Sequence, residues 1–349
     1  MNVNYPGMEV KITTHQPLLS ICIPTFNRNE YIEELLNNVI SQVTCYKDEV
    51  EVLVSDNHSY MSCENIVKNI SERFQISIKF YYQEENIGGE SNFAFLINES
   101  KGKYLHILGD DDLYAPYLYS CLIPSLKLKD YGLICLNSLC IDLNNKLGIH
   151  MPIRSFAGII SEMSAQEFIK HTISRHGLIS NIIINRVVWE TGYKYRSPRY
   201  FLFQALSTEL YGILETKLLC LSIDMPMVIQ RCGQKHSFIG EYFDSLILGL
   251  LNLYKDLDKQ VPGLYYNFKK NISDLSFINT MYPVVYNKKH YRKTKNQYKE
   301  HFGLVGMLGL NFWLYMPGAK YFKYILMPTI WFFKTIKEKA KLFKNDKFK

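Results

Sequence analysis

The sequence predicts an α/β protein with a mostly parallel central sheet, and three observations support this fold class. Short apolar runs rich in β-branched residues alternate with amphipathic segments over roughly the first 140 positions. Polar and acidic residues follow directly after several of these runs. The chain has 349 residues, 47% of them hydrophobic, which is enough for a large core. Such an alternation is typical of βαβ units.

The first part of the chain divides into regular elements. Strands are expected at residues 18–24, 50–55, 76–82, 104–108 and 133–139. Helices are expected at 30–42, 63–70, 91–100 and about 116–129. Asn29 is expected to cap the first helix, and Ser62 the second. Pro116 suits the first turn of the last one.

Beyond residue 142 the alternation is looser. Ser164 and Glu167 have the spacing of a capping box before a short helix. Residues 178–185 and 218–223 are expected to be strands, with a helix near 201–214 between them. From residue 241 onward the chain is expected to be helical. These patterns predict an N-terminal lead over 1–17, one α/β domain over 18–235 and a helical C-terminal region over 236–349.

The formal net charge of +7 is unevenly distributed. Residues 286–349 hold fifteen lysines and arginines against three acids, a net of +12, which leaves −5 for residues 1–285. Two apolar stretches in this end, 302–319 and 324–333, are too short or too interrupted for a good membrane span. We expect their aromatic residues to enter a membrane interface while lysines meet anionic headgroups. The alternative is helices that pack on the domain.

The cysteines indicate a reducing compartment. All eight are scattered singly, without a CxxC pair or a common metal-binding spacing. The first residues are polar and lack the apolar core of a signal peptide. We therefore expect a cytoplasmic protein that is peripheral on the inner face of the cell membrane.

Chemistry-bearing residues follow the expected strands, where ligands collect in open α/β sheets. Pro24, Thr25, Asn27 and Arg28 follow the first strand, and Asp56 follows the second. The triplet of Asp110, Asp111 and Asp112 follows the fourth strand. Three adjacent carboxylates repel one another, so they need either solvent or a divalent cation such as Mg²⁺ or Mn²⁺.

Each of these features also has a simpler interpretation. The triplet alone is compatible with a solvated loop that caps a helix, and Asp56 with a turn residue. Arg28 is by default a surface cation, but it suits a diphosphate. The glycines at 88 and 89 either end a loop or let the backbone approach a ligand closely.

The segments SICIPTFNR, VLVSDN, NIGGESNFAF and YLHILGDDD together resemble the ordered motifs of family-2 glycosyltransferases with the GT-A fold. The resemblance covers about residues 18–142 and extends more weakly to about 232. It implies sugar transfer from a nucleotide-diphosphate donor, usually with inversion and with Mn²⁺ or Mg²⁺. HGLISNIIIN and the LGDDDL loop are loosely similar to O-antigen and capsule glycosyltransferases of the abequosyltransferase-like branch.

The resemblance assigns residues to roles. The donor nucleotide would be lined by Pro24, Thr25, Asn27, Arg28, Asp56, Gly88, Asn92, Asp110 and Asp111. Asp110 and Asp112 would reach metal and ribose, although Gly109 stands where family members often have the first Asp. The usual Glu-Asp pair that supplies the base is missing around residues 197–202. Glu209 and His176 are the substitutes, each with a structural role as its alternative.

These implications converge on one function and leave two alternatives. The expected function is a non-processive, inverting glycosyltransferase acting on a polyprenyl-diphosphate-linked glycan in bacterial O-antigen or capsule synthesis. No Gln-X-X-Arg-Trp motif of processive synthases is present. The alternatives are a non-enzymatic module that binds anionic lipid or nucleic acid, and a sugar nucleotidyltransferase. No nucleic-acid reader motif is present, so nucleic acid is not an expected partner.

Overall fold

The computed structural model describes residues 16–142, 149–150, 160–173, 175, 178–232, 248–271, 296 and 299–301. The chain divides into two compact units, and each is described by itself. The first unit comprises Met1–Pro198 and Leu202–Lys235, and the second comprises Arg199–Phe201 and His236–Lys349.

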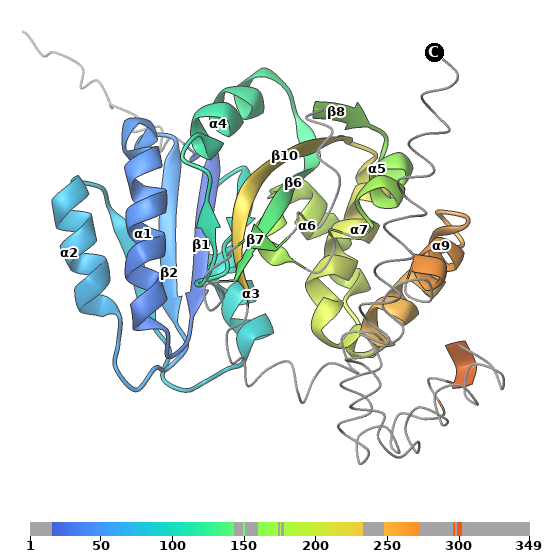
Figure 1. Ribbon diagram of the computed structural model, residues 1–349, viewed down its shortest axis with the longest axis horizontal. Helices are drawn as coiled ribbons and strands as arrows, with labels where there is room; N and C mark the ends of the chain where they lie inside the picture. The colour runs from blue at the N-terminus through green and yellow to red at the C-terminus, as the bar shows by residue number, and fades with distance from the viewer. Residues whose placement is uncertain are drawn as a thin grey trace, which may run out of the picture. The chain divides into compact units, whose positions relative to one another are not determined.

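The N-terminal half of the sheet is parallel, as the sequence predicts. Its strands are β1 (Leu19–Thr25), β2 (Val50–Asp56), β3 (Ile78–Tyr82) and β4 (Tyr104–Ile107), in the spatial order β3-β2-β1-β4. The register pairs Thr25 with Asp56 and Asp56 with Tyr82. The carboxyl ends of β1, β2 and β3 therefore meet at one edge of the sheet (Figure 1).

The other half of the sheet is mixed. Its path continues through β9 (Ile182–Asn185), β6 (Tyr131–Asp142), β10 (Leu219–Cys232) and β5 (Leu113–Tyr114). β9 runs antiparallel to both β4 and β6, whereas β6 and β10 are parallel. Two short strands lie off this path: β7 (Ile149–His150) pairs with β6, and β8 (Ile160–Met163) pairs with β10.

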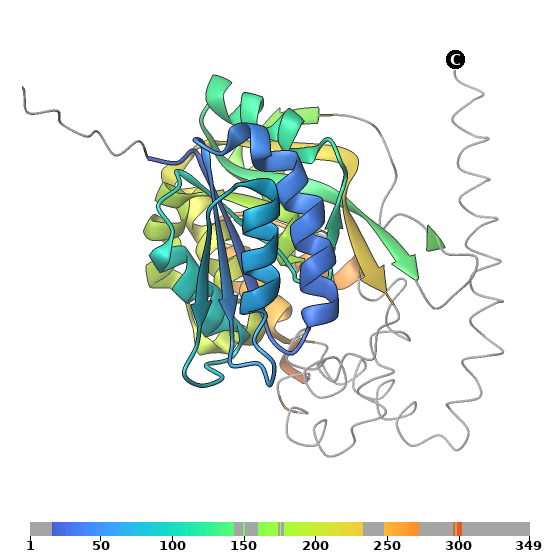
Figure 2. The same cartoon turned by 90° about the vertical axis from the view of Figure 1, so that its left-hand side faces the viewer.

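Helices cover both faces of the sheet. One face carries α1 (Asn29–Val43), α2 (Glu64–Phe74) and α4 (Leu118–Leu128); Figure 2 shows α1 and α2 in front of the strands. The other face is contacted by α3 (Gly89–Glu99), α6 (Arg186–Gly192) and α7 (Gln204–Thr216). An apolar stripe on α1 is buried and packs into the core with residues Ile32, Leu35, Leu36, Val39 and Ile40.

Several local expectations are confirmed and others are wrong. The capping box of Ser164 and Glu167 is present at α5 (Ala165–Thr172). Asn29 is not a cap: Arg28 holds the N-cap position of α1, and the Asn29 side chain donates to Met61 O. Pro116 lies before α4 rather than in its first turn, because that helix begins at Leu118.

The segment expected as one strand over 178–185 is two elements. A 3₁₀ turn, η2 (Ile179–Asn181), precedes the four-residue strand β9. The strand expected at 218–223 instead extends to Cys232, with register shifts around Pro226 that let a proline sit inside the ladder. Three further 3₁₀ segments are η1 (Thr44–Tyr46), η3 (Tyr193–Tyr195) and η4 (Pro198–Phe203).

α6 and α7 pack with their backbones in contact. A Cβ atom at Gly192 would overlap the carbonyl oxygen of Thr208, and one at Gly212 would overlap that of Val188. Glycine is therefore needed at both positions to bring the two helices together.

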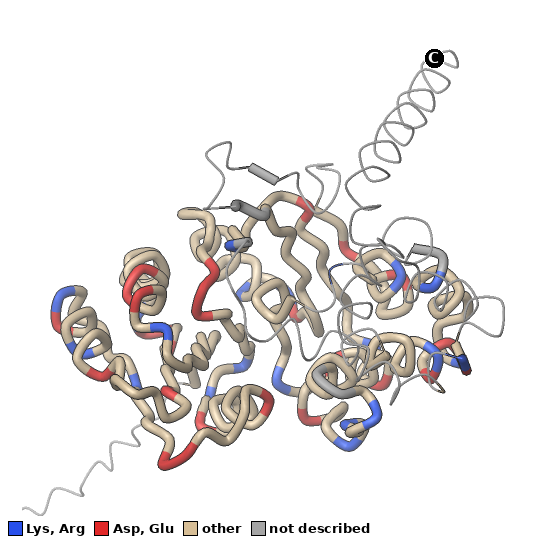
Figure 3. Tube along the Cα trace, turned by 60° about the horizontal axis from the view of Figure 1, so that its bottom comes forward, with Lys and Arg blue, Asp and Glu red and all other residues tan. Residues whose placement is uncertain are grey.

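In the second unit, the described residues form a helix over 248–257 and α9 (Leu264–Asn271). Buried His301 joins them, since its Nδ1 lies 2.8 Å from Tyr265 Oη and its Nε2 lies 3.0 Å from Asn252 Oδ1. Acidic and basic positions are interspersed over the described elements (Figure 3). Most of the basic C-terminal end, including 302–319 and 324–333, lies outside the described residues. Among the described helices, none is long and apolar enough to cross a bilayer.

Candidate functional site

The candidate site lies at the carboxyl edge of the parallel strands. β1 ends at Thr25, β2 ends at Asp56, and the acidic triplet follows β4 after two intervening residues. Because β1 pairs in parallel with both β2 and β4, the loops that follow them emerge at the same edge. This placement is the one that the motif order predicts.

An ionic cluster joins the first loop to the triplet. Arg28 Nη1 lies 2.7 Å from Asp110 Oδ1 and 2.9 Å from Asp111 Oδ2. Thr25 Oγ1 donates to Asp110 Oδ2 at 2.8 Å. Burial raises the pKa of Asp110, although Arg28 opposes the rise. Burial acts to lower the pKa of Arg28, but the two carboxylates outweigh it and raise that pKa.

Asp112 is the most buried of the three carboxylates in the triplet. It is 3% exposed, and burial raises its pKa to about 7, with further contributions from Asp111 and Asp110. Among the described residues, Ser180 is the neutral side chain that binds it: Ser180 Oγ donates to Asp112 Oδ2 at 2.6 Å. Its negative charge is thus held in a site with little compensation.

The loops after β1 and β2 are bonded to each other. Asn27 adopts a left-handed conformation (φ 54°), which asparagine tolerates better than most residues. Its Oδ1 accepts from Tyr60 N at 2.9 Å, and its own N–H donates to Ser59 Oγ at 2.7 Å. Asp56 accepts from Ser59 N at 2.9 Å and from Cys63 N at 3.1 Å, one bond to each oxygen. Asp56 therefore shapes its own loop, and each oxygen retains capacity for a further donor.

A second set of bonds holds the glycine turn before α3. Asn57 Nδ2 donates to Asn86 Oδ1 at 2.9 Å, and Asn57 Oδ1 accepts from Ile87 N at 3.0 Å. Gly88 has a φ of 81°, which favours glycine, and its N–H donates to Asn86 Oδ1. The turn is therefore placed by the β2 loop.

Two other residues that are predicted to line the donor nucleotide are Asn92 and Pro24. Asn92 is 1% exposed and exchanges hydrogen bonds with Ser55: Ser55 Oγ donates to Asn92 Oδ1, and Asn92 Nδ2 donates to Ser55 O. Pro24 is half-buried within β1, opposite Ser55 in the register. These contacts tie α3 to the end of β2, so Asn92 supports the edge from within.

Glu209 lies on α7 beside a second carboxylate. It is 4% exposed, and burial followed by the charge of Glu90 raises its pKa to about 8. Burial also raises the pKa of Glu90 to about 7, against the opposing effect of Arg196, whose Nη2 lies 2.9 Å from Glu90 Oε2. His176 lies outside the described residues.

Two residues near the triplet were not found from the sequence. Ser180 lies in the segment over 178–185 that the sequence predicts to be a strand, and HGLISNIIIN, which contains it, is loosely similar to a branch of glycosyltransferases. Arg231, 8% exposed on β10, pairs with Glu34 at 2.6 Å, and its charge acts to lower the pKa of Asp112. Neither contact has a signature in local sequence.

The carboxylates fit a cation that is shared with a ligand. Within the described part of the chain, no three His, Cys, Asp or Glu side chains form a ready-made metal cage. Mg²⁺ and Mn²⁺, however, typically take one or two protein carboxylates and complete their shell with phosphate oxygens and water. Buried Asp112, with its raised pKa, is a carboxylate whose charge such a cation would neutralise.

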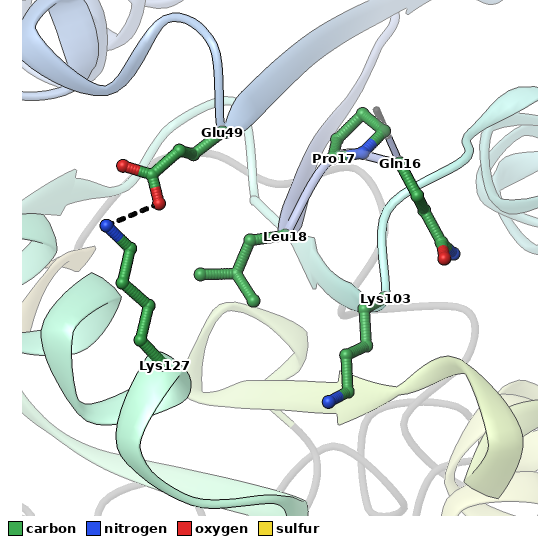
Figure 4. Close-up of a pocket in the computed structure, with 6 residues that line it drawn as sticks. All are labelled: Gln16, Pro17, Leu18, Glu49, Lys103 and Lys127. Carbon is green, nitrogen blue, oxygen red and sulfur yellow. Dashed lines mark ion pairs between the residues drawn. The ribbon is translucent and has the colours of Figure 1, made fainter. Parts of the chain in front are cut away.

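A pocket of about 370 Å³ lies at the opposite edge of the sheet (Figure 4). It is lined by Gln16, Pro17, Leu18, Glu49, Lys103 and Lys127. Leu18, Glu49 and Lys103 directly precede β1, β2 and β4, and Lys127 pairs with Glu49 at 2.6 Å. This pocket is therefore separate from the triplet.

Solved structures define the class to which this fold belongs. TarS 1–349 of S. aureus, solved with UDP-GlcNAc, matches with a TM-score of 0.57 and 15% identity, over 76% of this chain and 79% of that one. The UDP complex of the same protein matches with a TM-score of 0.54 and 16% identity, over 76% of this chain and 80% of that one. The likeness confirms the predicted α/β GT-A fold.

The sequence comparisons then give the family. Residues 20–184 match the model of glycosyl transferase family 2. Abequosyltransferase RfbV of Salmonella typhimurium is 35% identical over 98 residues, 28% of this chain and 29% of that protein. Validoxylamine A glucosyltransferase of Streptomyces hygroscopicus is 37% identical over 73 residues, 21% of this chain and 16% of that one. The matches thus span less than a third of either relative, and it is residues 20–184 of this chain that match the family-2 glycosyltransferase model.

Proposed function

We propose that this protein transfers a sugar from a nucleotide-diphosphate donor to a hydroxyl group of a glycan acceptor, one sugar per encounter and with inversion. The observation that carries the proposal is the convergence of Arg28, Asp110 and Asp111 beside buried Asp112. A diphosphate leaving group gains negative charge as it departs, and a fixed guanidinium stabilises such charge. The family-2 match over residues 20–184 supports this reaction class over a binding module or a nucleotidyltransferase.

Donor binding is assigned to the edge described above. Asn27, Asp56 and Gly88 belong to the bonded loops that would receive the nucleotide, with Pro24 and Asn92 supporting them from β1 and α3. Thr25 would orient Asp110 through its hydroxyl. Asp112 and Asp110 would hold Mn²⁺ or Mg²⁺, which when bound neutralises the charge of the donor diphosphate.

The donor and metal assignments are tested together. A panel of nucleotide sugars is screened by thermal shift with Mn²⁺, and the donor that raises the melting temperature is used for hydrolysis and transfer assays. We expect Asp110→Asn and Asp112→Asn each to lower turnover at least about a hundredfold. Asp48→Asn is the control, since Asp48 is exposed and lies before β2. Full turnover in both variants, or in EDTA, contradicts the metal site.

Glu209 is the base that we assign to the acceptor hydroxyl, with His176 as the second candidate. A carboxylate whose pKa is raised to about 8 is a stronger base than an ordinary one. We expect Glu209→Gln to lower kcat about a hundredfold or more while donor affinity is kept. Glu215→Gln is the control on the same helix, because Glu215 pairs with Lys194 at the surface. An unchanged kcat in Glu209→Gln moves the assignment to His176.

We further propose that the acceptor is a polyprenyl-diphosphate-linked intermediate of O-antigen or capsule synthesis, met at the inner face of the cell membrane. The name of the abequosyltransferase relative and the basic, aromatic C-terminal sequence support this. The full chain should float with liposomes that contain anionic lipid and not with neutral ones. Replacing Lys334, Lys337, Lys339 and Lys341 together by Glu should abolish flotation. Equal flotation of the variant contradicts the membrane assignment.

A further inference from the structure

The hydroxyl of Ser180 is fixed between two groups of the triplet loop. Ser180 Oγ donates to Asp112 Oδ2 at 2.6 Å and accepts from Gly109 N at 2.9 Å. Ser180 is fully buried and Asp112 is 3% exposed, so water does not compete freely for either bond. With its proton given to the carboxylate and a lone pair taken by the amide, the hydroxyl has a defined orientation.

Ser180 is itself held by a side chain of β4. His106 on β4 lies with Nε2 3.0 Å from Ser180 O, and its Nδ1 lies 3.3 Å from Tyr119 Oη on α4. His106 is fully buried, so its neutral ring donates through one nitrogen and accepts through the other. The carbonyl of Ser180 needs the Nε2 proton, and Nδ1 then accepts from Tyr119. A continuous chain of bonds thus runs from Tyr119 through His106 and Ser180 to Asp112.

Gly109 leaves the room that this arrangement requires. A Cβ atom at Gly109 would lie 3.0 Å from Asp112 Oδ2 and 3.1 Å from Ser180 Oγ, closer than ordinary van der Waals contact. The position at which family members often have a carboxylate is therefore occupied, in this chain, by a glycine packed against a serine hydroxyl.

We propose that Ser180 is a positioning residue that orients the Asp112 carboxylate for the divalent cation of the donor complex. The inference rests on the proposed function, because it assumes that Asp112 binds the cation. Partners that orient metal-binding carboxylates commonly change metal affinity ten- to a hundredfold when removed. A serine that only satisfied a buried carboxylate would affect stability without a specific effect on metal affinity.

The experiment compares two buried serines in the full chain. Ser180→Ala removes the bond to Asp112. Ser100→Ala is the matched control, because Ser100 Oγ also makes two bonds, donating to Ile97 O at 2.7 Å and accepting from Arg186 Nη2 at 2.9 Å, at the opposite edge of the sheet. Mn²⁺ binding is measured with Mn²⁺ alone by electron paramagnetic resonance of the free ion. The Mn²⁺ concentration for half-maximal donor hydrolysis is measured in parallel.

We expect Ser180→Ala to weaken Mn²⁺ binding at least about tenfold and to shift the activation constant by a similar factor, with Ser100→Ala within about twofold of the wild type. Ser180→Cys keeps a weak hydrogen-bond donor of similar size, so its Mn²⁺ affinity should lie between those of Ser180→Ala and the wild type. This variant replaces Ser180→Ala if Ser180→Ala does not fold. Wild-type Mn²⁺ binding in the Ser180 variants overturns the inference alone. A wild-type chain that binds no Mn²⁺ and whose donor hydrolysis does not depend on Mn²⁺ overturns the proposed metal site as well.

Discussion

Arg28 Nη1 lies within hydrogen-bonding distance of carboxylate oxygens from both Asp110 and Asp111, at 2.7 and 2.9 Å. One guanidinium nitrogen thus connects the loop after β1 to the loop after β4. The side chain of Arg28 is still 30% exposed, so a ligand can reach it. Arg28 is therefore able to hold the triplet in shape and to meet a ligand anion.

We expect Arg28→Lys to lower kcat/KM for sugar transfer by about a hundredfold, because an ammonium is a point charge that does not reproduce the planar fork of a guanidinium. Steady-state kinetics at saturating Mn²⁺ checks this. Arg73→Lys is the control, since Arg73 lies in the last turn of α2. Equal losses in the two variants, or none in Arg28→Lys, contradict the assignment.

Asp56 is expected to matter for stability in addition to any contact with the donor. Its carboxylate satisfies the buried N–H groups of Ser59 and Cys63, and an alanine leaves both unpaired. We expect Asp56→Ala to lower the free energy of unfolding by about 2–6 kcal/mol, from about 1–3 kcal/mol for each of the two unsatisfied groups. Urea denaturation measures the change, and exposed Asp48→Ala should stay within about 0.5 kcal/mol of the wild type.

The buried carboxyl of Glu209 makes stability depend on pH. The pKa is raised from 4.5 to about 8 in the folded chain. Between these values the unfolded chain releases the proton that the native chain keeps, so this group makes folding less favourable as the pH rises. We expect the free energy of unfolding of Glu209→Gln, relative to the wild type, to increase from pH 5 to pH 8.5. A difference that does not change with pH, or one that Glu215→Gln reproduces, contradicts this.

His106 gives the opposite dependence at lower pH. Burial lowers its pKa from 6.5 to about 4 in the folded chain. The unfolded chain therefore takes up a proton first, and the stability present above pH 6.5 is lost as the pH falls toward 4. We expect His106→Gln to flatten this decline in a series of urea titrations. Exposed His58→Asn, which keeps a residue that tolerates the left-handed backbone there, should retain the wild-type slope.

The contact between α6 and α7 predicts a strong glycine requirement. A Cβ atom at Gly192 has no space against the carbonyl of Thr208. We expect Gly192→Ala to cost about 1–3 kcal/mol of unfolding free energy or more, because both backbones must move apart. Gly89→Ala is the control, since a Cβ there meets no atom within 4 Å and α3 begins at this residue. Thermal unfolding of both variants measures the contrast.

Much of the parallel half-sheet was predictable because its strands are short apolar runs bounded by polar residues. Residues 178–185 show the limit of that reasoning. Ile179 and the isoleucines of β9 lie in one segment rich in β-branched residues, yet the chain turns through η2 before the strand begins. Local pattern does not distinguish the two states, because the turn is stabilised by tertiary contacts such as the one from His106 to Ser180 O.

The candidate site likewise contains residues that were predictable from the sequence and residues that were not. The placement of the triplet near Thr25 and Arg28 was predictable, since both groups follow apolar runs closely. Arg28 suits a diphosphate, and the carboxylates suit its cation. Ser180 and Arg231 were not, because their proximity to Asp112 comes from η2 and β10, which are distant from the triplet in sequence. The sequence indicates Asp56 and Asn92 as candidate site residues. Their bonds to backbone groups and to Ser55 were not predictable, because these bonds depend on the folded loops.

The bonded loops of the candidate site have a consequence for how the protein can diverge. Every bond described within them, from Asn27 to Tyr60 and from Asn57 to Asn86, joins residues inside one contiguous stretch between β1 and α3. We therefore expect these loops to keep their internal bonds when residues of the second half change, whereas the triplet loop is tied through Asp112 to Ser180 and Arg231.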